Sequence, residues 1–163
     1  MAEEKKSEGK KIAAIRVRGK AKIREDIKAT LKLLNLNRIN HCVILADTPQ
    51  NRGMLNKVKD YVTWGEIDKE ILVDMLKKRG RLAGNRRIDD DYMKKTPHKS
   101  IDKLADDLIK SKTTIKSTEI KPVFRLRPPV KGYERGGIKK PYTLGGALGY
   151  RKKQINNLLE RMI

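Results

Sequence analysis

The residues best suited to chemistry in this sequence are cations that alternate with aromatic rings near its C-terminal end. From Lys121 to Lys153 there are ten lysines and arginines, and Glu134 is the one acid. An arginine guanidinium binds phosphate through paired hydrogen bonds and stacks on bases, whereas a lysine acts as a point charge. Aromatic rings among such cations can stack on unpaired bases. The candidate RNA-binding residues of segment 121–151 are Arg125, Arg127, Lys131, Arg135, Lys139, Lys140, Tyr142, Tyr150 and Arg151.

The backbone of segment 121–151 is predicted to be a long loop. It contains four prolines and six glycines, a density that neither a helix nor a central strand tolerates. Glycines let the backbone approach RNA closely, and we expect the segment to be poorly ordered without RNA. A solvated basic linker is the alternative, and packing of the rings on the protein body is the alternative to base stacking.

Three further basic groups are candidates for RNA contact. Arg52 lies near the start of a predicted helix, where free N–H groups favour phosphate. Arg16 and Arg18 lie on the face of a predicted strand opposite Ile15 and Val17, and they are exposed if the helices cover the other face. For each of these groups an ordinary solvent-facing cation is the alternative. The third group, with the same ambiguity, consists of Arg79, Arg81, Arg86 and Arg87.

No constellation typical of catalysis is found. His41 and Cys42 are adjacent on a predicted strand, so their side chains point to opposite faces and cannot form a dyad. One cysteine and two histidines, the second being His98, do not make a zinc site of recognisable spacing. The run 89–91 of three aspartates is better explained as an acidic helix start than as a metal site. We therefore expect no enzymatic activity, no cofactor, no metal and no small-molecule substrate.

Hydrophobic spacing predicts the elements that position these residues. Strands are expected at 12–17, 41–46 and 61–64, the last ended by Gly65, with amphipathic helices between them. Asn35 is expected as a left-handed helix cap, and Thr48 as the N-cap of the second helix, with Pro49 in its first turn. The fold class is α+β. It comprises a β-α-β-α-β core with a small three-stranded sheet and helices on one face, followed by additional helices and the basic loop.

The predicted organisation has five parts. Asp68 and Ser100 are expected to cap helices of an extension, and Gly80 to stop the first of them. The expected parts are a disordered tail (1–11), the β-α-β-α-β core (12–67), a helical extension (68–120), the basic RNA-binding loop (121–151) and a C-terminal helix (152–163).

Composition limits the partners. The formal charge is +20 on 163 residues, with a pI near 10.1. That much charge repels itself unless a polyanion is bound, and phosphate contacts also release counterions. No apolar stretch approaches the roughly 20 residues that span a bilayer, and the N-terminus lacks an apolar signal core. With Cys42 as the one cysteine, these features predict a cytoplasmic protein without a membrane partner.

Three stretches resemble one family over most of the chain, from Ile12 onward. The core stretch reads LNLNRINHCVILADTPQNRGMLNKVKDYVTWGEI, and the later stretches read LKKRGRLAGNRR and KPVFRLRPPVKGYERGGIKKPYTLGGALGYR. The first resembles the large-subunit ribosomal protein called L-thirty in bacteria and L-seven in eukaryotes. The later two resemble the longer archaeal form. The resemblance implies a β-α-β-α-β core, a structural role on large-subunit ribosomal RNA among neighbouring ribosomal proteins, and a location in the cytoplasmic ribosome.

Two other functions compete with a structural ribosomal role. An RNA-processing enzyme needs a clustered acid, base or metal set, which the sequence does not offer. A DNA-architectural protein usually carries a groove-entering element or an apolar wedge. The Pro/Gly-rich basic segment suits irregular RNA better than a regular groove, so the ribosomal role is favoured.

Overall fold

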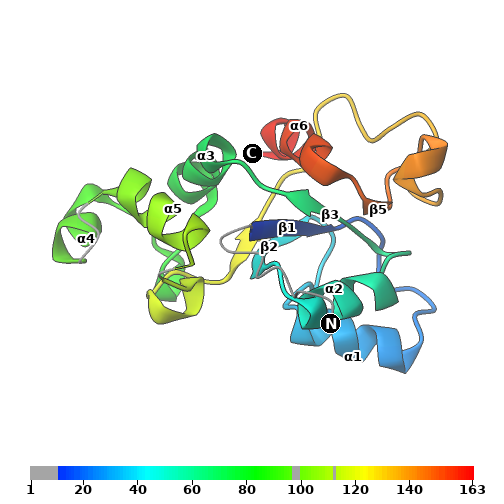
Figure 1. The fold of residues 1–163 in the computed structure, drawn as a ribbon, viewed down its shortest axis with the longest axis horizontal. Coiled ribbons are helices and arrows are strands. Elements are labelled where there is room, and N and C mark those ends of the chain that lie inside the picture. The colour runs from blue at the N-terminus through cyan, green and yellow to red at the C-terminus, as the bar shows by residue number, and fades with distance from the viewer. Residues whose placement is uncertain (1–10, 97–99, 112) are drawn as a thin grey trace, which may run out of the picture.

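A mixed sheet between two layers of helices forms the centre of the structure, a computed structural model that describes residues 11–96, 100–111 and 113–163 (Figure 1). The strands are β1 (Lys11–Arg16), β2 (His41–Ala46), β3 (Val62–Glu66), β4 (Val123–Arg125) and β5 (Gly149–Tyr150). The α-helices are α1 (Glu25–Leu33), α2 (Pro49–Lys57), α3 (Lys69–Arg79), α4 (Asp90–Lys95), α5 (Ile101–Ile109) and α6 (Ile155–Met162). The 3-10 turns are η1 (Ala83–Asn85), η2 (Ile115–Ser117), η3 (Tyr142–Leu144) and η4 (Lys152–Gln154).

The predicted three-stranded core is the centre of a larger sheet. Among the described residues the strand order is β4-β2-β1-β3-β5. β1 pairs antiparallel with both β2 and β3, with Ala13 opposite Ile44 on one side and Gly65 on the other. The two edge strands come from segment 121–151: β4 pairs antiparallel with β2, and β5 pairs parallel with β3. The α+β class is confirmed, and part of the predicted loop is strand.

Local signals for the helix ends are largely confirmed. The Thr48 hydroxyl accepts a hydrogen bond from the Asn51 N–H at 3.2 Å, and Pro49 follows in the first turn. The Ser100 hydroxyl caps α5 in the same way, at 3.3 Å from the Lys103 nitrogen. Asn35 adopts the expected left-handed conformation, with a φ of 60°. Asp68 precedes α3, but its carboxylate accepts from the Asn156 amide rather than from the helix.

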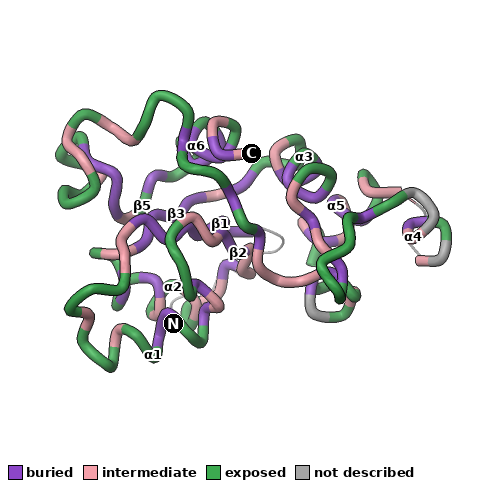
Figure 2. Tube along the Cα trace, turned by 180° about the vertical axis from the view of Figure 1, so that it is seen from behind, coloured by how far each residue is buried: buried purple, intermediate pink, exposed green. Residues whose placement is uncertain are grey.

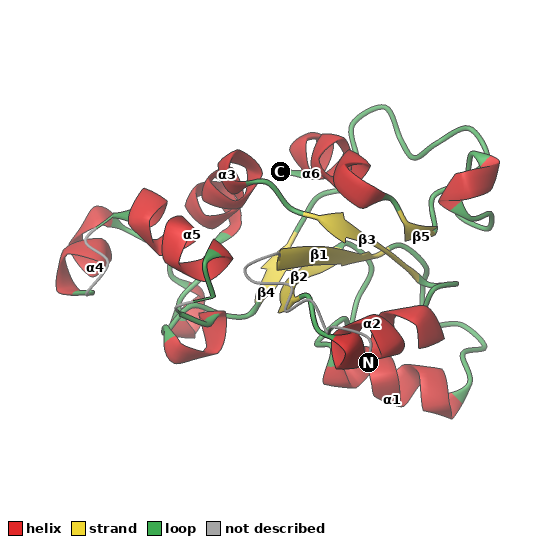
Figure 3. Cartoon of the chain, in the orientation of Figure 1, coloured by secondary structure: helices red, strands yellow, loops and turns green. Residues whose placement is uncertain are grey.

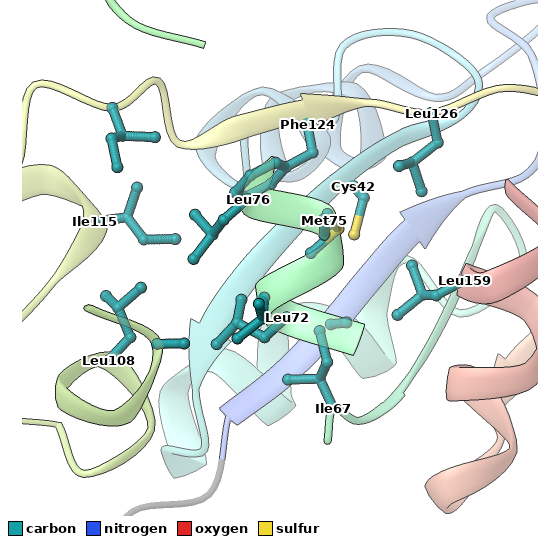
Figure 4. Close-up of a cluster of buried hydrophobic side chains, with 14 of the residues drawn as sticks. Cys42, Ile67, Leu72, Met75, Leu76, Leu108, Ile115, Phe124, Leu126 and Leu159 are labelled. Atoms are coloured by element: carbon teal, nitrogen blue, oxygen red, sulfur yellow. The ribbon is translucent and has the colours of Figure 1, made fainter. Parts of the chain in front are cut away.

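Helices cover both faces of the sheet, as Figure 3 shows. α1 and α2 pack on the face of β1 that carries Ile12 and Ala14. The other face, which carries Ala13 and Ile15, is covered by α3, α5 and α6. Figure 4 shows this second core, in which Cys42, Met75 and Leu159 lie together. β1 is therefore buried along its whole length.

Two expected boundaries in this region are wrong. The expected tail 1–11 is one residue too long, because Lys11 is buried and is the first residue of β1. The rest of the expected tail lies outside the described residues. Gly65 does not end the third strand, which continues to Glu66. A Cβ on Gly65 would lie 2.0 Å from the Lys152 carbonyl oxygen, so glycine is required there for the close approach of η4. Gly80 stops α3 as expected, although its φ of −59° is not that of a left-handed cap.

Between β4 and β5 the chain makes a long excursion over the end of the sheet, which is largely exposed in Figure 2. Its first part runs beside α6, where the N–H groups of Arg127 and Val130 donate to backbone oxygens near the helix end. The part from 133 to 148 folds back on itself through backbone hydrogen bonds. One of these joins the Gly136 N–H to the Gly145 oxygen at 2.9 Å. Residues 133–148 are therefore a small lobe, which we call the hairpin lobe, rather than a single loop.

Candidate nucleic-acid interface

Six predicted cations of segment 121–151 are exposed. On β4 the alternation of side chains sends Phe124 into the core and Arg125 to the surface. None of the six makes an ion pair with a described carboxylate, which leaves their charges available to a partner. These exposed cations are Arg125, Arg127, Lys131, Arg135, Lys139 and Lys140.

The fold brings the arginines at the end of α3 to this segment. Partial burial lowers the pKa of Arg79, and the positive charges of Arg127 and Arg81 lower it further. Arg79 also donates two hydrogen bonds to the Ile163 oxygen, at 2.7 and 3.2 Å. The Lys121 N–H donates to the Arg81 oxygen at 2.8 Å, which attaches the start of the segment to the same place. Two groups that the sequence shows only as separate runs are thus one cationic surface.

The rest of the α3 group lies beside it. Arg81 and Arg87 form an antiparallel bridge, and Arg86 and Arg87 are exposed. Arg81 itself is partly buried. The short turn η1 separates Arg81 from Arg86 and Arg87, and the latter two lie on the surface.

Sequence reasoning missed Arg38, which extends the basic surface along the β4 edge. His41 pairs with Arg125 in the sheet. Burial lowers the pKa of His41, and the charges of Arg125 and Arg38 lower it further. Arg38 is exposed, and its place beside Arg125 depends on the pairing of β2 with β4, so no local signal marks it.

The expected exposure of Arg16 is wrong. Its side chain is buried, and its guanidinium donates to the backbone oxygens of Leu36 at 2.7 Å and Gly19 at 2.9 Å. The prediction assumed one layer of helices, whereas α1 and α2 cover the Arg16 face of β1. Arg18, two residues on, is partly exposed, and its guanidinium lies 5.0 Å from the centre of the Tyr61 ring.

Arg151 is also buried, and it anchors the hairpin lobe. Its guanidinium donates to both carboxylate oxygens of Glu134, to the Ala147 oxygen at 2.9 Å and to the Thr63 hydroxyl at 2.7 Å. The same guanidinium lies over the Tyr142 ring, with its central carbon 4.7 Å from the ring centre. Burial, the largest single influence, raises the pKa of Glu134. The hydrogen bond from Arg151, a backbone hydrogen bond and the positive charges of Arg151 and Arg161 together outweigh burial and hold the pKa below its usual value. Arg151 is therefore a structural centre rather than a surface cation.

Arg52 keeps its exposure although it has a partner. It forms an ion pair with the buried Asp47 carboxylate, and the hydrogen bond from Arg52 raises the pKa of the guanidinium. The Arg52 side chain remains 58% exposed. The negative charge of Glu66 also acts on it, so Arg52 belongs to the β3–β5 edge of the sheet.

At that edge Tyr150 is exposed, and its position is well defined. Its hydroxyl donates to Glu66 Oε1 at 2.8 Å, and its ring centre is 6.4 Å from that of Trp64. Base stacking and packing on the protein body were the two alternatives for the aromatic rings, and the two tyrosines differ in this respect. Tyr142 packs on the protein through Arg151, whereas Tyr150 presents its ring at the surface.

The other residues considered for chemistry lie apart. Cys42 is buried in the core, and burial raises the pKa of its thiol; His98 lies outside the described residues. Within 11–96, 100–111 and 113–163, no group of three histidines, cysteines or acids is arranged to hold a metal. In the same ranges no helix has the length and apolar character needed to cross a bilayer.

Comparison with known proteins confirms the resemblance seen in the motifs. The family model for ribosomal protein L30p/L7e matches residues 12–62. The chain is 52% identical over 151 residues to large ribosomal subunit protein uL30 of Methanococcus vannielii, covering 93% of this chain and 98% of the relative. The uL30 proteins of Nanoarchaeum equitans and Methanopyrus kandleri are 49% and 50% identical, with 97% and 100% of the relatives covered. Since identity of this level extends over nearly the whole of each relative, the chain belongs to the L30p/L7e family of ribosomal proteins.

Proposed function

We propose that this protein is a structural constituent of the large ribosomal subunit that binds ribosomal RNA through its basic surface. Membership of the family implies a structural ribosomal role. The partners we propose are large-subunit ribosomal RNA and neighbouring ribosomal proteins, in the ribosome of the cytoplasm. The surface proposed for RNA contact is formed by segment 121–151, the arginines at the end of α3, Arg52 and the partly exposed Arg18.

The crowding of cations on one surface is the observation that carries this proposal. Arg79, Arg81 and Arg127 lie close enough for their charges to lower one pKa, and the exposed cations of the segment make no ion pair with a described carboxylate. Like charges held together destabilise the folded state unless a polyanion lies against them. RNA phosphates supply that charge and release counterions on contact.

The two buried arginines have a different role in the proposal. Arg16 fastens the turn after β1 to the loop after α1, and Arg151 holds the hairpin lobe to β3. They position the exposed cations and do not themselves reach phosphate. The candidate RNA-binding set is therefore narrower than the one expected from the sequence.

Salt-dependent binding to large-subunit ribosomal RNA tests the proposal. The variant replaces four exposed cations of the segment by alanine. Because up to four phosphate contacts disappear, affinity should fall. The slope of log K against log salt should flatten by about 0.7–0.9 per contact, up to about 3 in total. The melting temperature of the free protein should hardly change, since these side chains are exposed. The four replaced residues are Arg125, Arg127, Lys139 and Lys140.

A matched control removes the same charge from another surface. It replaces four exposed lysines on and beside α1 and α2, and it should leave most of the affinity and slope intact. If both quadruple variants bind alike, binding follows net charge and the assignment to this surface is wrong. If the first variant binds as tightly as the wild type at every salt concentration, segment 121–151 is not an RNA anchor. The control positions are Lys28, Lys32, Lys57 and Lys59.

A further inference from the structure

A cavity at the β3–β5 edge has the wall chemistry of a site for a single unpaired base. Its volume is about 970 Å³, it is open to solvent, and Tyr150, Lys152, Lys153 and Glu66 are among the residues that line it. Binding pockets for small ligands span about 300–1,000 Å³, so a nucleotide fits within it. A second, smaller hollow of about 140 Å³ lies beside it, lined by Trp64 and Arg52. Tyr150 and Glu66 line both spaces.

Tyr150 is a prepared stacking surface. Its backbone is held by the parallel pairing of β5 with β3, where Tyr150 lies opposite Trp64. Its hydroxyl is held by Glu66, and the residue remains 42% exposed. A ring that is already oriented loses little conformational freedom when a base stacks on it. The lysines 152 and 153 are both exposed at the same cavity, where they can contact the phosphates on either side of that base.

Of the two carboxylates at this cavity, Glu66 has the greater hydrogen-bonding capacity to spare. Both oxygens of Glu134, the other acid in the lining, are taken by Arg151. Glu66 accepts one hydrogen bond, from Tyr150, and makes no ion pair with any described residue. An ionised carboxylate offers about four acceptor positions. On a surface that binds phosphate, a carboxylate repels the backbone, and hydrogen bonds accepted from a base offset that repulsion.

We infer that this cavity binds an unpaired guanine of an RNA strand, stacked on Tyr150 and read by the Glu66 carboxylate. Guanine presents two neighbouring donors, N1–H and N2–H, which match the two oxygens of a carboxylate. The base-pairing edges of adenine, cytosine and uracil place an acceptor beside each donor, so a carboxylate meets repulsion on those bases. The inference rests on the proposed function, because it assumes that RNA is the ligand of this surface.

The test uses the full chain and short single-stranded oligoribonucleotides that differ in one central base. Trp64 is the only tryptophan and lies next to Tyr150, so its fluorescence reports binding at this edge. The guanine oligonucleotide should bind about 5- to 150-fold more tightly than the others, the range for one bidentate base contact. Tyr150→Leu should weaken binding of every oligonucleotide about 5- to 150-fold, whereas Tyr150→Phe, which keeps the ring, should retain most of it.

Glu66→Gln provides the decisive variant. A glutamine amide offers one acceptor and one donor, which match N6–H and N1 of adenine, so the preference should move from guanine to adenine. Glu160→Gln, on the exposed side of α6, makes the same charge change elsewhere and should leave the guanine preference intact. A carboxylate that acts only as a counter-charge for Arg52 predicts a uniform change for all bases, and that result overturns the inference.

Failure of the inference and failure of the proposed function give different results. If the wild type binds large-subunit ribosomal RNA but shows no base preference, or does not bind the oligonucleotides, the guanine site is wrong and the proposed function stands. If it does not bind large-subunit ribosomal RNA at all, the proposed function itself is wrong.

Discussion

Replacing Arg151 by alanine should release the hairpin lobe and destabilise the protein. Arg151 is 2% exposed and joins three parts of the chain: Glu134, the Ala147 oxygen and the Thr63 hydroxyl of β3. Removing one partner of a buried ion pair costs about 3–5 kcal/mol, because the other charge stays buried and unpaired. The Glu134 side chain is 23% exposed, so water relieves part of that penalty. The expected loss in unfolding free energy is therefore near the lower end, about 3 kcal/mol.

Urea unfolding followed by circular dichroism measures the loss, and limited trypsin digestion locates it. In the variant, cleavage after Arg135 and Lys139, both in the hairpin lobe, should precede cleavage elsewhere, because the lobe loses its anchor. Arg161→Ala is the matched control: Arg161 also pairs with Glu134, at 3.7 Å, but its side chain is 34% exposed. Exposed pairs contribute about 0–1 kcal/mol. If Arg151→Ala costs less than about 0.5 kcal/mol, an ordinary surface effect, the structural role assigned to Arg151 is refuted.

Three further predictions concern pH and packing. The folded-state pKa of Glu134 lies below its usual value of 4.5. The contribution of ionised Glu134 to the free energy of unfolding should therefore be complete well above pH 4.5 and be lost as the pH falls through the folded-state pKa. Measurement of the unfolding free energy against pH should show this loss in the wild type but not in Glu134→Gln. Leu31→Ala should lower the unfolding free energy by about 2–5 kcal/mol, since Leu31 is 1% exposed between α1 and the sheet. Gly65→Ala should destabilise the protein by about 1–3 kcal/mol or more, because the added methyl group pushes η4 away from β3. Gly53→Ala, in open space on α2, should instead stabilise it by about 0.4–1 kcal/mol. Equal melting temperatures for these two variants contradict the packing argument.

The sequence by itself determined the central β-α-β-α-β order and the ends of several helices. Alternation over 12–17 and the four- and three-residue spacing of Ile27, Leu31 and Leu34 are properties of single elements, and each element needs only its own period to be recognised. The caps at Thr48 and Ser100 are equally local, because the hydroxyl and the amide that it accepts from lie three residues apart. The excess of positive charge was also readable without a fold, and it predicted a polyanionic partner.

The sequence did not determine which cations reach the surface. Arg16 and Arg125 look alike as strand residues beside apolar neighbours, yet one is buried among carbonyl oxygens and the other is exposed. The difference arises because α1 and α2 cover the Arg16 face of the central strand β1, whereas Arg125 lies on the edge strand β4. Both placements depend on contacts between distant segments.

The tertiary structure alone decided how segment 121–151 is used. β4 and β5 contain three and two residues, too few for any periodicity, and they are strands only because the edges of β2 and β3 offer them hydrogen bonds. The pairing of Arg151 with Glu134 and the meeting of Arg79 with Arg127 likewise join residues far apart in the chain. Periodicity and capping act within one turn or one strand, whereas burial and charge proximity depend on the packing of the whole chain. For this reason composition predicted a polyanionic ligand, and only the fold indicated which cations are exposed.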